Sequence, residues 1–154
     1  MAAFWTLLGV FVGIAGKYVV DLKLAKKNKL REEKLKWAVE FLAAASQLAQ
    51  AVTAQSDWQL ELRNTIASET GEQSADQRTA RLNRSKEEQT RVRSAWAEAY
   101  RANSAVRLLM PAATESAAGY LDLCGAAPDP TERGRDGAEA RKEIEATLRD
   151  EVYG

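Results

Sequence analysis

The chain has 154 residues, 22 basic and 22 acidic side chains, no histidine and a single cysteine, Cys124. Without histidine there is no Ser-His-Asp triad, no His-ligated metal and no imidazole acid or base. One cysteine forms neither an internal disulfide nor a zinc cluster. We therefore expect no enzyme activity, no metal and no cofactor. Cys124 lies at a helix-like apolar position and is expected to be a small core residue.

Residues 2–20 form the most apolar stretch, and Lys17 is its only charged side chain. As a helix this stretch is about 28 Å long, close to the thickness of a bilayer's hydrocarbon core. Trp5 near one end and Tyr18 near the other suit the two interfaces. We expect a single-pass transmembrane anchor. The alternatives are a cleavable signal peptide, which usually begins with positive charge, and a buried helix of a soluble protein.

A basic segment follows the apolar stretch. Residues 17–36 contain eight Lys or Arg and three Asp or Glu, whereas the remainder contains fourteen and nineteen. The positive-inside rule then places the N-terminus outside the cell (inner) membrane and the rest of the chain in the cytoplasm. We expect the basic residues to form a collar at an anionic membrane surface. The collar consists of Lys17, Lys23, Lys26, Lys27, Lys29, Arg31, Lys34 and Lys36.

Small residues recur within the apolar stretch. Gly9 and Gly13 form a G-x-x-x-G pair, and Gly16 follows about one turn later. This spacing allows two spans to approach closely, so it is a candidate for dimerisation of the anchor.

Two long helices are predicted after the collar, because apolar residues recur every three or four positions over residues 38–66 and 82–110. The stretch SETGEQSAD between them has turn chemistry, with Gly71 as a helix C-cap and Ser74 or Asp76 as an N-cap. Two periodic helices joined by a short polar turn fold back as an antiparallel hairpin.

The turn predicts the register of this hairpin, in which the numbers of facing residues add up to about 144. The expected neighbours are Leu48 with Trp96, Gln55 with Gln89, and Phe41 with Tyr100 and Asn103. Facing glutamines can satisfy each other and would penalise a slipped register. The alternative is that this far end of the hairpin is solvated.

Pro111 is expected to end the second helix, near the level of Lys34. The following segment, AATESAAGYLDLCG, is predicted to return along the membrane-proximal half of the hairpin as a third short helix. A last helix has a narrow apolar stripe of Ile144, Leu148 and Val152. It is expected to dock on the bundle, with pairing to another copy and a free helix as alternatives.

The predicted fold class is therefore all-α, an N-terminal transmembrane helix that continues into an antiparallel hairpin or three-helix bundle. The expected parts are an anchor (1–20), a helical bundle (21–124), a linker (125–137) and a C-terminal amphipathic helix (138–154).

Four arginines recur at helical spacing on the second helix, at Arg78, Arg81, Arg84 and Arg91. A phosphate- or nucleic-acid-binding strip is one interpretation. Glutamates at 87 and 88 interrupt the row and no aromatic residue lies within it, so an ordinary solvated face is the preferred interpretation and nucleic acid is not an expected partner.

The order of these parts resembles that of uncharacterised small single-span bacterial membrane proteins with a cytoplasmic hairpin rich in alanine and arginine. The stretch WAEAYRANSAVRLLMPAATESAAGYL is similar to their hairpin ends. The resemblance implies an architecture and no activity. We expect a non-catalytic tether, scaffold or accessory subunit whose partners are the lipid bilayer, an unidentified protein or another copy. The alternative is a membrane-active effector or pore component that oligomerises through its span.

Overall fold

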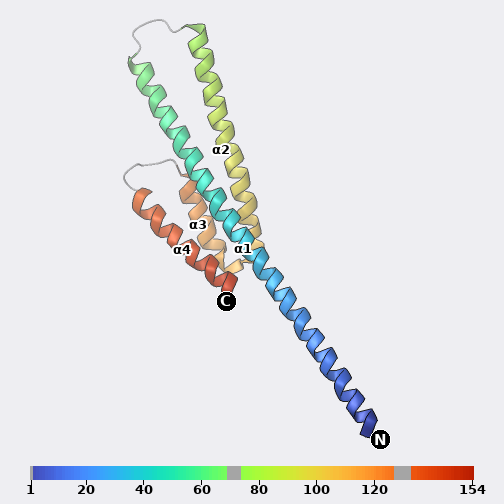
Figure 1. Ribbon diagram of the computed structural model, residues 1–154. Coiled ribbons are helices and arrows are strands. Elements are labelled where there is room, and N and C mark those ends of the chain that lie inside the picture. The colour runs from blue at the N-terminus through green and yellow to red at the C-terminus, as the bar shows by residue number, and fades with distance from the viewer. Residues whose placement is uncertain (1, 69–73, 127–132) are drawn as a thin grey trace.

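The computed structural model describes the backbone of residues 2–68, 74–126 and 133–154, and the side chains of residues 20–68, 74–126 and 137–154. Within these ranges the fold is all-α, as predicted. Its elements are α1 (Ala2–Ser68), α2 (Ala75–Leu109), the short 3₁₀ helix η1 (Pro111–Ala113), α3 (Thr114–Gly125) and α4 (Arg133–Tyr153). The helices α1 and α2 form an antiparallel hairpin, and α3 and α4 pack beside the half of the hairpin that is nearer its open end (Figure 1).

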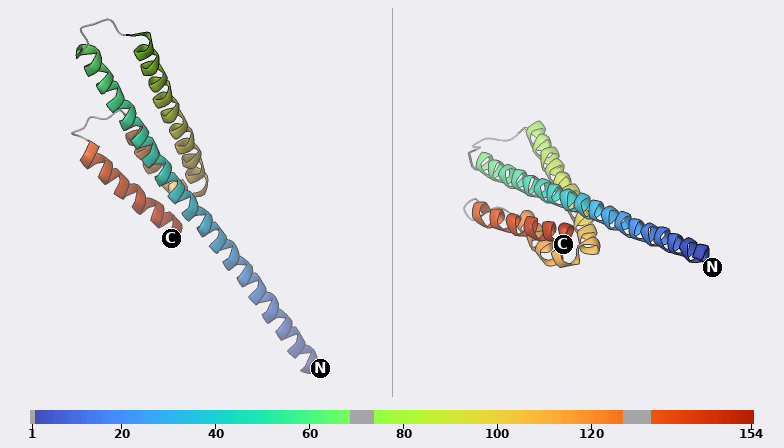
Figure 2. Two further views of the ribbon diagram at one scale, coloured as in Figure 1. Left: turned by 45° about the horizontal axis from the view of Figure 1, so that its top comes forward. Right: turned by 60° about the horizontal axis from the view of Figure 1, so that its bottom comes forward.

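The helix α1 is the longest of the described helices. It continues unbroken through 67 residues, and its N-terminal part extends alone beyond the bundle in all three views of Figures 1 and 2. Every side chain from Val20 to Leu30 is exposed, and the first less exposed one is Arg31. The bundle therefore covers only the later part of α1.

Local sequence signals set the ends of α2. Ser74 is its N-cap: the hydroxyl of Ser74 accepts a hydrogen bond from the backbone N–H of Gln77, and the Gln77 side chain accepts one from the N–H of Ser74. This reciprocal capping box satisfies backbone donors that the first turn leaves free. At the other end Pro111 begins η1 directly after Met110. The predicted cap at Ser74 and the predicted stop at Pro111 are confirmed, whereas Gly71 lies outside the described residues.

Alanine dominates the contact between α1 and α2. The buried residues of α2 include Ala95, Ala99 and Ala102, and those of α1 include Ala38, Ala44, Ala45 and Ala51. Small side chains let two helices approach closely, which brings more backbone and Cβ atoms into van der Waals contact. The apolar row predicted over residues 82–110 is confirmed in its later part, where Ala99, Val106 and Met110 are buried and Trp96 packs against the core. It is wrong in its earlier part, where Leu82 and Gln89 are exposed. Leu82 is 61% exposed.

The predicted register of the hairpin is confirmed by two ion pairs between its helices. Arg84 lies 3.5 Å from Glu61, and Arg101 lies 3.8 Å from Glu40. Both pairs join residues whose numbers add up to within a few of the expected value. The proposed burial of Gln89 against Gln55 is wrong, since Gln89 is exposed and its neighbour Glu88 is buried instead.

The core lies where α3 and α4 meet the hairpin. Its largest fully buried side chains come from all four helices and the turn after α2, namely Phe41, Leu48, Val106, Met110, Leu121 and Ile144. The ring of Phe41 lies 6.4 Å from that of Tyr120 on α3, and Tyr100, which was expected near Phe41, is exposed and stacks on Trp96. Cys124 is buried in this core, as expected.

The helix α4 completes a four-helix bundle where three helices were predicted. It begins at Arg133, within the segment expected to be a linker. Its apolar stripe of Ile144, Leu148 and Val152 is buried, so the preferred prediction that this helix docks on the bundle is confirmed. The two-helix arm beyond the ends of α3 and α4 is also present as expected (Figure 1).

A close approach fixes the end of α3. The indole ring of Trp96 on α2 lies against Gly125, and a Cβ atom at Gly125 would overlap that ring. Trp96 is also held on its other side by Tyr100, with the two ring centroids 5.0 Å apart. Gly125 therefore leaves the space that the indole fills. At Gly119, in the middle of the same helix, a Cβ atom would meet nothing within 4 Å.

We predict opposite effects of two alanine substitutions in α3. Gly125→Ala displaces the Trp96 ring and should lower the free energy of unfolding by about 1–3 kcal/mol. Gly119→Ala meets open space and favours the helix, so it should leave stability unchanged or raise it by up to about 1 kcal/mol. Chemical denaturation followed by circular dichroism measures both. Equal stability of the two variants would contradict the packing described.

Candidate functional site

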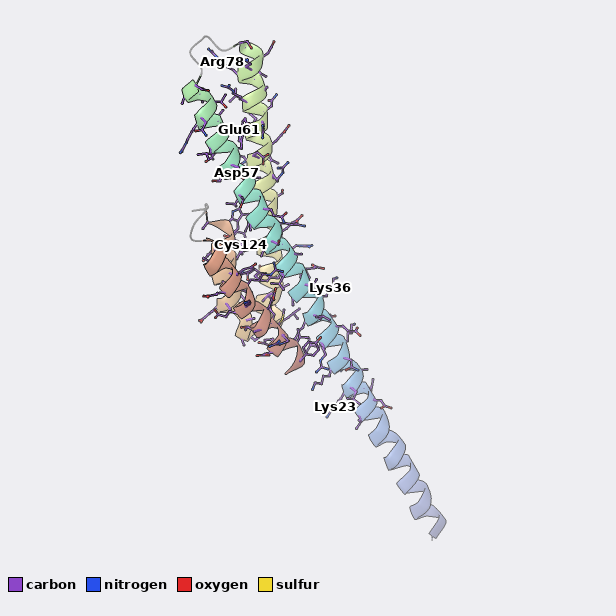
Figure 3. The ribbon with its side chains drawn as sticks, turned by 60° about the vertical axis from the view of Figure 1, so that its left-hand side comes forward. Lys23, Lys36, Asp57, Glu61, Arg78 and Cys124 are labelled. Carbon is purple, nitrogen blue, oxygen red and sulfur yellow. The ribbon has the colours of Figure 1, made fainter. Side chains whose placement is uncertain are left out.

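The predicted collar is divided by the bundle. Lys23, Lys26, Lys27 and Lys29 are exposed on the part of α1 that has no packed neighbour, and Lys23 lies below the bundle in Figure 3. Lys17 and the glycines Gly9, Gly13 and Gly16 belong to α1, but only their place in this helix is described, and not their surroundings. Of the remaining three basic residues, Arg31 and Lys34 contact α4, and Lys36 contacts side chains of α1 itself.

Arg31 and Lys34 bind the C-terminal end of α4. Arg31 Nε donates to the backbone carbonyl of Val152 at 3.1 Å, and its guanidinium lies 5.5 Å from the centre of the Tyr153 ring. Lys34 Nζ donates to the carbonyl of Glu151 at 2.9 Å. The last carbonyls of a helix have no partner within the helix and carry its negative dipole end, so cations stabilise them. The last turn of α4 has no basic residue of its own. Two cations from α1 supply that role.

The carboxylate of Glu151 joins three elements at this point. One of its oxygens accepts a hydrogen bond from Lys34 Nζ at 2.9 Å, and the other accepts one from the backbone N–H of Ala112 at 2.8 Å. The hydrogen bond from Lys34, assisted by that from Ala112, lowers the pKa of the Glu151 carboxyl although partial burial opposes this. Because Ala112 follows Pro111, these contacts also confirm the predicted level of Pro111 beside Lys34. We call Arg31, Lys34, Ala112 and Glu151 the base junction.

Sequence reasoning assigned Arg31 and Lys34 to a membrane surface and did not foresee the base junction. Lys36, the last collar residue, lies 3.8 Å from Glu40 and above the ring of Trp37. A run of cations is visible in the sequence, but its partners come from a helix more than a hundred residues away. Only the absence of a cation at the end of α4 could have suggested the contact.

The two helices of the hairpin are joined by two similar clusters of tryptophan, glutamate and arginine. In the outer cluster the guanidinium of Arg84 lies 4.0 Å from the centre of the Trp58 ring and 3.5 Å from a carboxylate oxygen of Glu61. In the inner cluster Arg101 lies over Trp37 and 3.8 Å from Glu40. Figure 3 labels Glu61 on the arm.

Both clusters start from the same short motif on α1, W-x-x-E, which occurs as WAVE at 37–40 and as WQLE at 58–61. The three-residue spacing places each tryptophan and glutamate on one face, within reach of one arginine from α2. This repeat was overlooked in the sequence, although it is visible there. The clusters fix the register of α1 against α2.

A groove of about 460 Å³ lies between α1 and α2, between the two clusters. Its lining combines small residues with polar ones: Gln47, Gln50, Ala51, Ala54, Arg91, Ser94, Ala95 and Glu98. Arg91 makes two hydrogen bonds, of 3.0 and 3.1 Å, to the carboxylate of Glu88. Arg84 and Arg91, two members of the predicted arginine row, therefore have acidic partners in the hairpin, while Arg78 is exposed near the tip (Figure 3).

Tyr120 and Cys124 form a polar contact inside the bundle. Burial, together with the neighbouring Cys124, raises the pKa of the Tyr120 hydroxyl from its usual 10.0 to about 12. The Tyr120 hydroxyl therefore stays protonated in the core at neutral pH. No cluster of three or more His, Cys, Asp or Glu residues suited to holding a metal ion occurs within the described residues.

Among the parts of the chain that the structure describes, no helix has an 18-residue window apolar enough to cross a membrane. The expected anchor at 2–20 falls almost entirely on residues whose side chains are outside that description. The structure therefore describes the helical bundle, and the anchor remains a prediction from the sequence.

Comparison of this chain with protein-family models, with curated proteins and with solved structures gave no match.

We predict that the base junction weakens in acid. A carboxyl whose folded pKa is lowered stabilises the fold above its ordinary pKa, near 4.5, and this contribution is lost as the pH falls through the lower folded value. Glu151→Gln should lower the free energy of unfolding at pH 7 by about 1–2 kcal/mol. The difference between wild type and variant should shrink in chemical denaturation below pH 4. A difference that does not depend on pH would contradict the role of the charge.

We predict that the outer arginine cluster contributes to stability through Trp58. Arg84→Gln and Trp58→Leu should each destabilise the hairpin, and the double variant should fall short of their sum by about 0.5–1 kcal/mol. Arg78→Gln, which changes an exposed arginine on the same helix, serves as the control and should be neutral. Additive effects in a double-mutant cycle would show that the arginine and the ring do not interact.

Proposed function

We propose that this chain is a non-catalytic interaction module that residues 2–20 anchor in a membrane and whose helical bundle binds a protein partner. The observation that carries the proposal is the continuity of α1, which extends from the apolar stretch of the sequence into the bundle as one helix. A helix has no internal hinge, so an anchor at its beginning would hold the bundle at a fixed distance from the bilayer.

The charge pattern supports the same proposal. Four exposed lysines, from Lys23 to Lys29, follow the apolar stretch on the uncovered part of α1. Near an anionic cytoplasmic leaflet each cation contributes about 1 kcal/mol of attraction. By the positive-inside rule this side of the anchor lies in the cytoplasm. These four lysines are the ones that we expect at the membrane surface, because Arg31 and Lys34 already bind α4.

The surface of the bundle supports binding to a protein in preference to chemistry on a small molecule. Several large apolar side chains are exposed on α1 and α2, among them Leu35, Val39, Leu60 and Leu108, which is 83% exposed. Exposed apolar side chains on helices are typical contact residues for other helices. The groove between α1 and α2 is lined by small and polar residues, and its one arginine, Arg91, is paired with Glu88.

We predict that the full-length chain floats with lipid vesicles in a density gradient. Leu8→Arg with Ile14→Arg places two cations in the apolar stretch, at about 2.5–3.5 kcal/mol each, and should abolish flotation. Leu82→Arg adds a cation to an exposed position on α2 and should not.

Flotation that survives the double substitution would contradict anchoring by residues 2–20. If expression of the wild type collapses the membrane potential of growing cells and the double variant does not, the pore alternative would replace the proposed one. Protease added outside intact cells should leave the bundle uncut.

A further inference from the structure

The helix α1 has a second heptad-spaced row of residues beside the one that faces the core. The core row contains Ala38, Phe41, Ala45, Leu48 and Val52. The second row, which we call the outer row, is offset around the helix and contains Leu35, Val39, Leu42, Ser46, Ala49 and Thr53. Leu35 and Val39 are 44% and 59% exposed, and the other four are partly exposed. Two of these four, Leu42 and Ala49, touch the core with one side and are open on the other.

The outer row lies away from α2. The residues of α1 that meet α2 include Ala51, which shares a groove with Ala95, and Trp58, which meets Arg84. At about 100° per residue, Ala49 and Thr53 point well away from that direction. The spacing of four and three residues along the outer row is that of a coiled-coil seam.

The outer row changes from large to small side chains along its length. Leu35, Val39 and Leu42 form its first half, and Ser46, Ala49 and Thr53 form its second half. The second half lies on an open part of the α1 surface, together with Gln50, Ala54 and Asp57. The row therefore has one half of large side chains and one half of small side chains.

We propose that the outer row binds the outer row of a second copy of this chain in an antiparallel pair. A two-fold axis near residue 44 places Leu35 opposite Thr53, Val39 opposite Ala49, and Leu42 opposite Ser46. Each layer then contains one large and one small side chain, so the two helices keep one separation along the contact. A parallel pair would place large side chains against large ones and small against small, which one separation cannot satisfy.

Charge complementarity favours the same arrangement. On the solvent side of the seam the antiparallel pair places Lys29 of one copy opposite Asp57 of the other, and symmetry repeats this pair at the other end. Both side chains are exposed, and Asp57 lies on the arm beside Glu61 (Figure 3). Such rim pairs add little affinity but select orientation. The contact is isologous, so it closes as a dimer and does not extend into a filament.

The self-association does not depend on a membrane, but its consequence rests on the proposed function. In an antiparallel pair the two N-terminal ends of α1 point in opposite directions. From residue 20 to the axis near residue 44, the helix covers about 36 Å. Two anchored copies would therefore bridge two membrane surfaces about 70 Å apart. In this arrangement the protein partner of the bundle is a second copy of the chain.

Cysteine cross-linking of the full-length chain tests the geometry. In a Cys124→Ala background, a mixture of the Val39→Cys and Ala49→Cys proteins should form a mixed disulfide dimer under mild oxidation, since facing residues of one layer are within disulfide reach. Val39→Cys alone should not, because its two copies lie about 15 Å apart along the axis. Cross-linking of Val39→Cys alone would establish a parallel pair and overturn the proposal.

Two further variants test whether the outer row drives association. Val39→Glu should weaken dimerisation measured by sedimentation at least about tenfold, because the charge faces Ala49 of the other copy. Leu82→Glu, also at an exposed leucine, should leave it unchanged. A wild-type chain that stays monomeric at all concentrations would overturn the proposal.

The anchor variant separates this proposal from the proposed function. Leu8→Arg with Ile14→Arg should still form the mixed disulfide, since the contact lies in the bundle. Loss of the dimer in that variant would show that copies associate through the apolar stretch and not through the outer row. Failure of wild-type flotation with an intact disulfide would instead refute only the membrane anchor.

Discussion

The rest of the structure depends on the close packing of α1 against α2 through alanine. A two-helix hairpin buries little surface, so its stability requires that the two helices approach closely where they pack. Ala44, Ala51, Ala95 and Ala102 make that approach in the inner half of the hairpin. The bulky side chains of Phe41 and Leu48 are fully buried in the core that α1 and α2 share with α3 and α4.

The base junction completes this arrangement at the open end of the hairpin. There α1 provides two cations, α4 provides its last carbonyls and one carboxylate, and η1 provides a backbone N–H. The contact stabilises a helix end whose last turn has no basic residue of its own. It also takes Arg31 and Lys34 from the predicted collar, whereas the lysines from Lys23 to Lys29 precede the bundle and remain exposed.

Local signals made much of the fold predictable. The capping residue Ser74, the stop at Pro111, the hairpin register and the stripe of α4 are all readable because each depends on neighbours in the sequence. The buried face of α2 was predicted only in part. Alanine contributes little to a hydrophobic pattern, although its small side chain lets α1 and α2 approach each other. The base junction was not foreseen, since nothing near Arg31 indicates that its partner is Val152. The repeated W-x-x-E motif was predictable from spacing and was overlooked.

The proposed function combines two parts of α1 that follow each other along one helix: an apolar beginning and a bundle that covers only its later portion. The most direct test of this combination is the depth of α1 in a bilayer. Single fluorescent labels at Val10, Lys27 and Ala43 of the full-length chain in anionic vesicles can be quenched by lipids that carry quenchers at known depths. We expect the label at 10 to lie in the hydrocarbon core, that at 27 near the headgroups, and that at 43 in water. A label at 10 that remains in water would contradict the account.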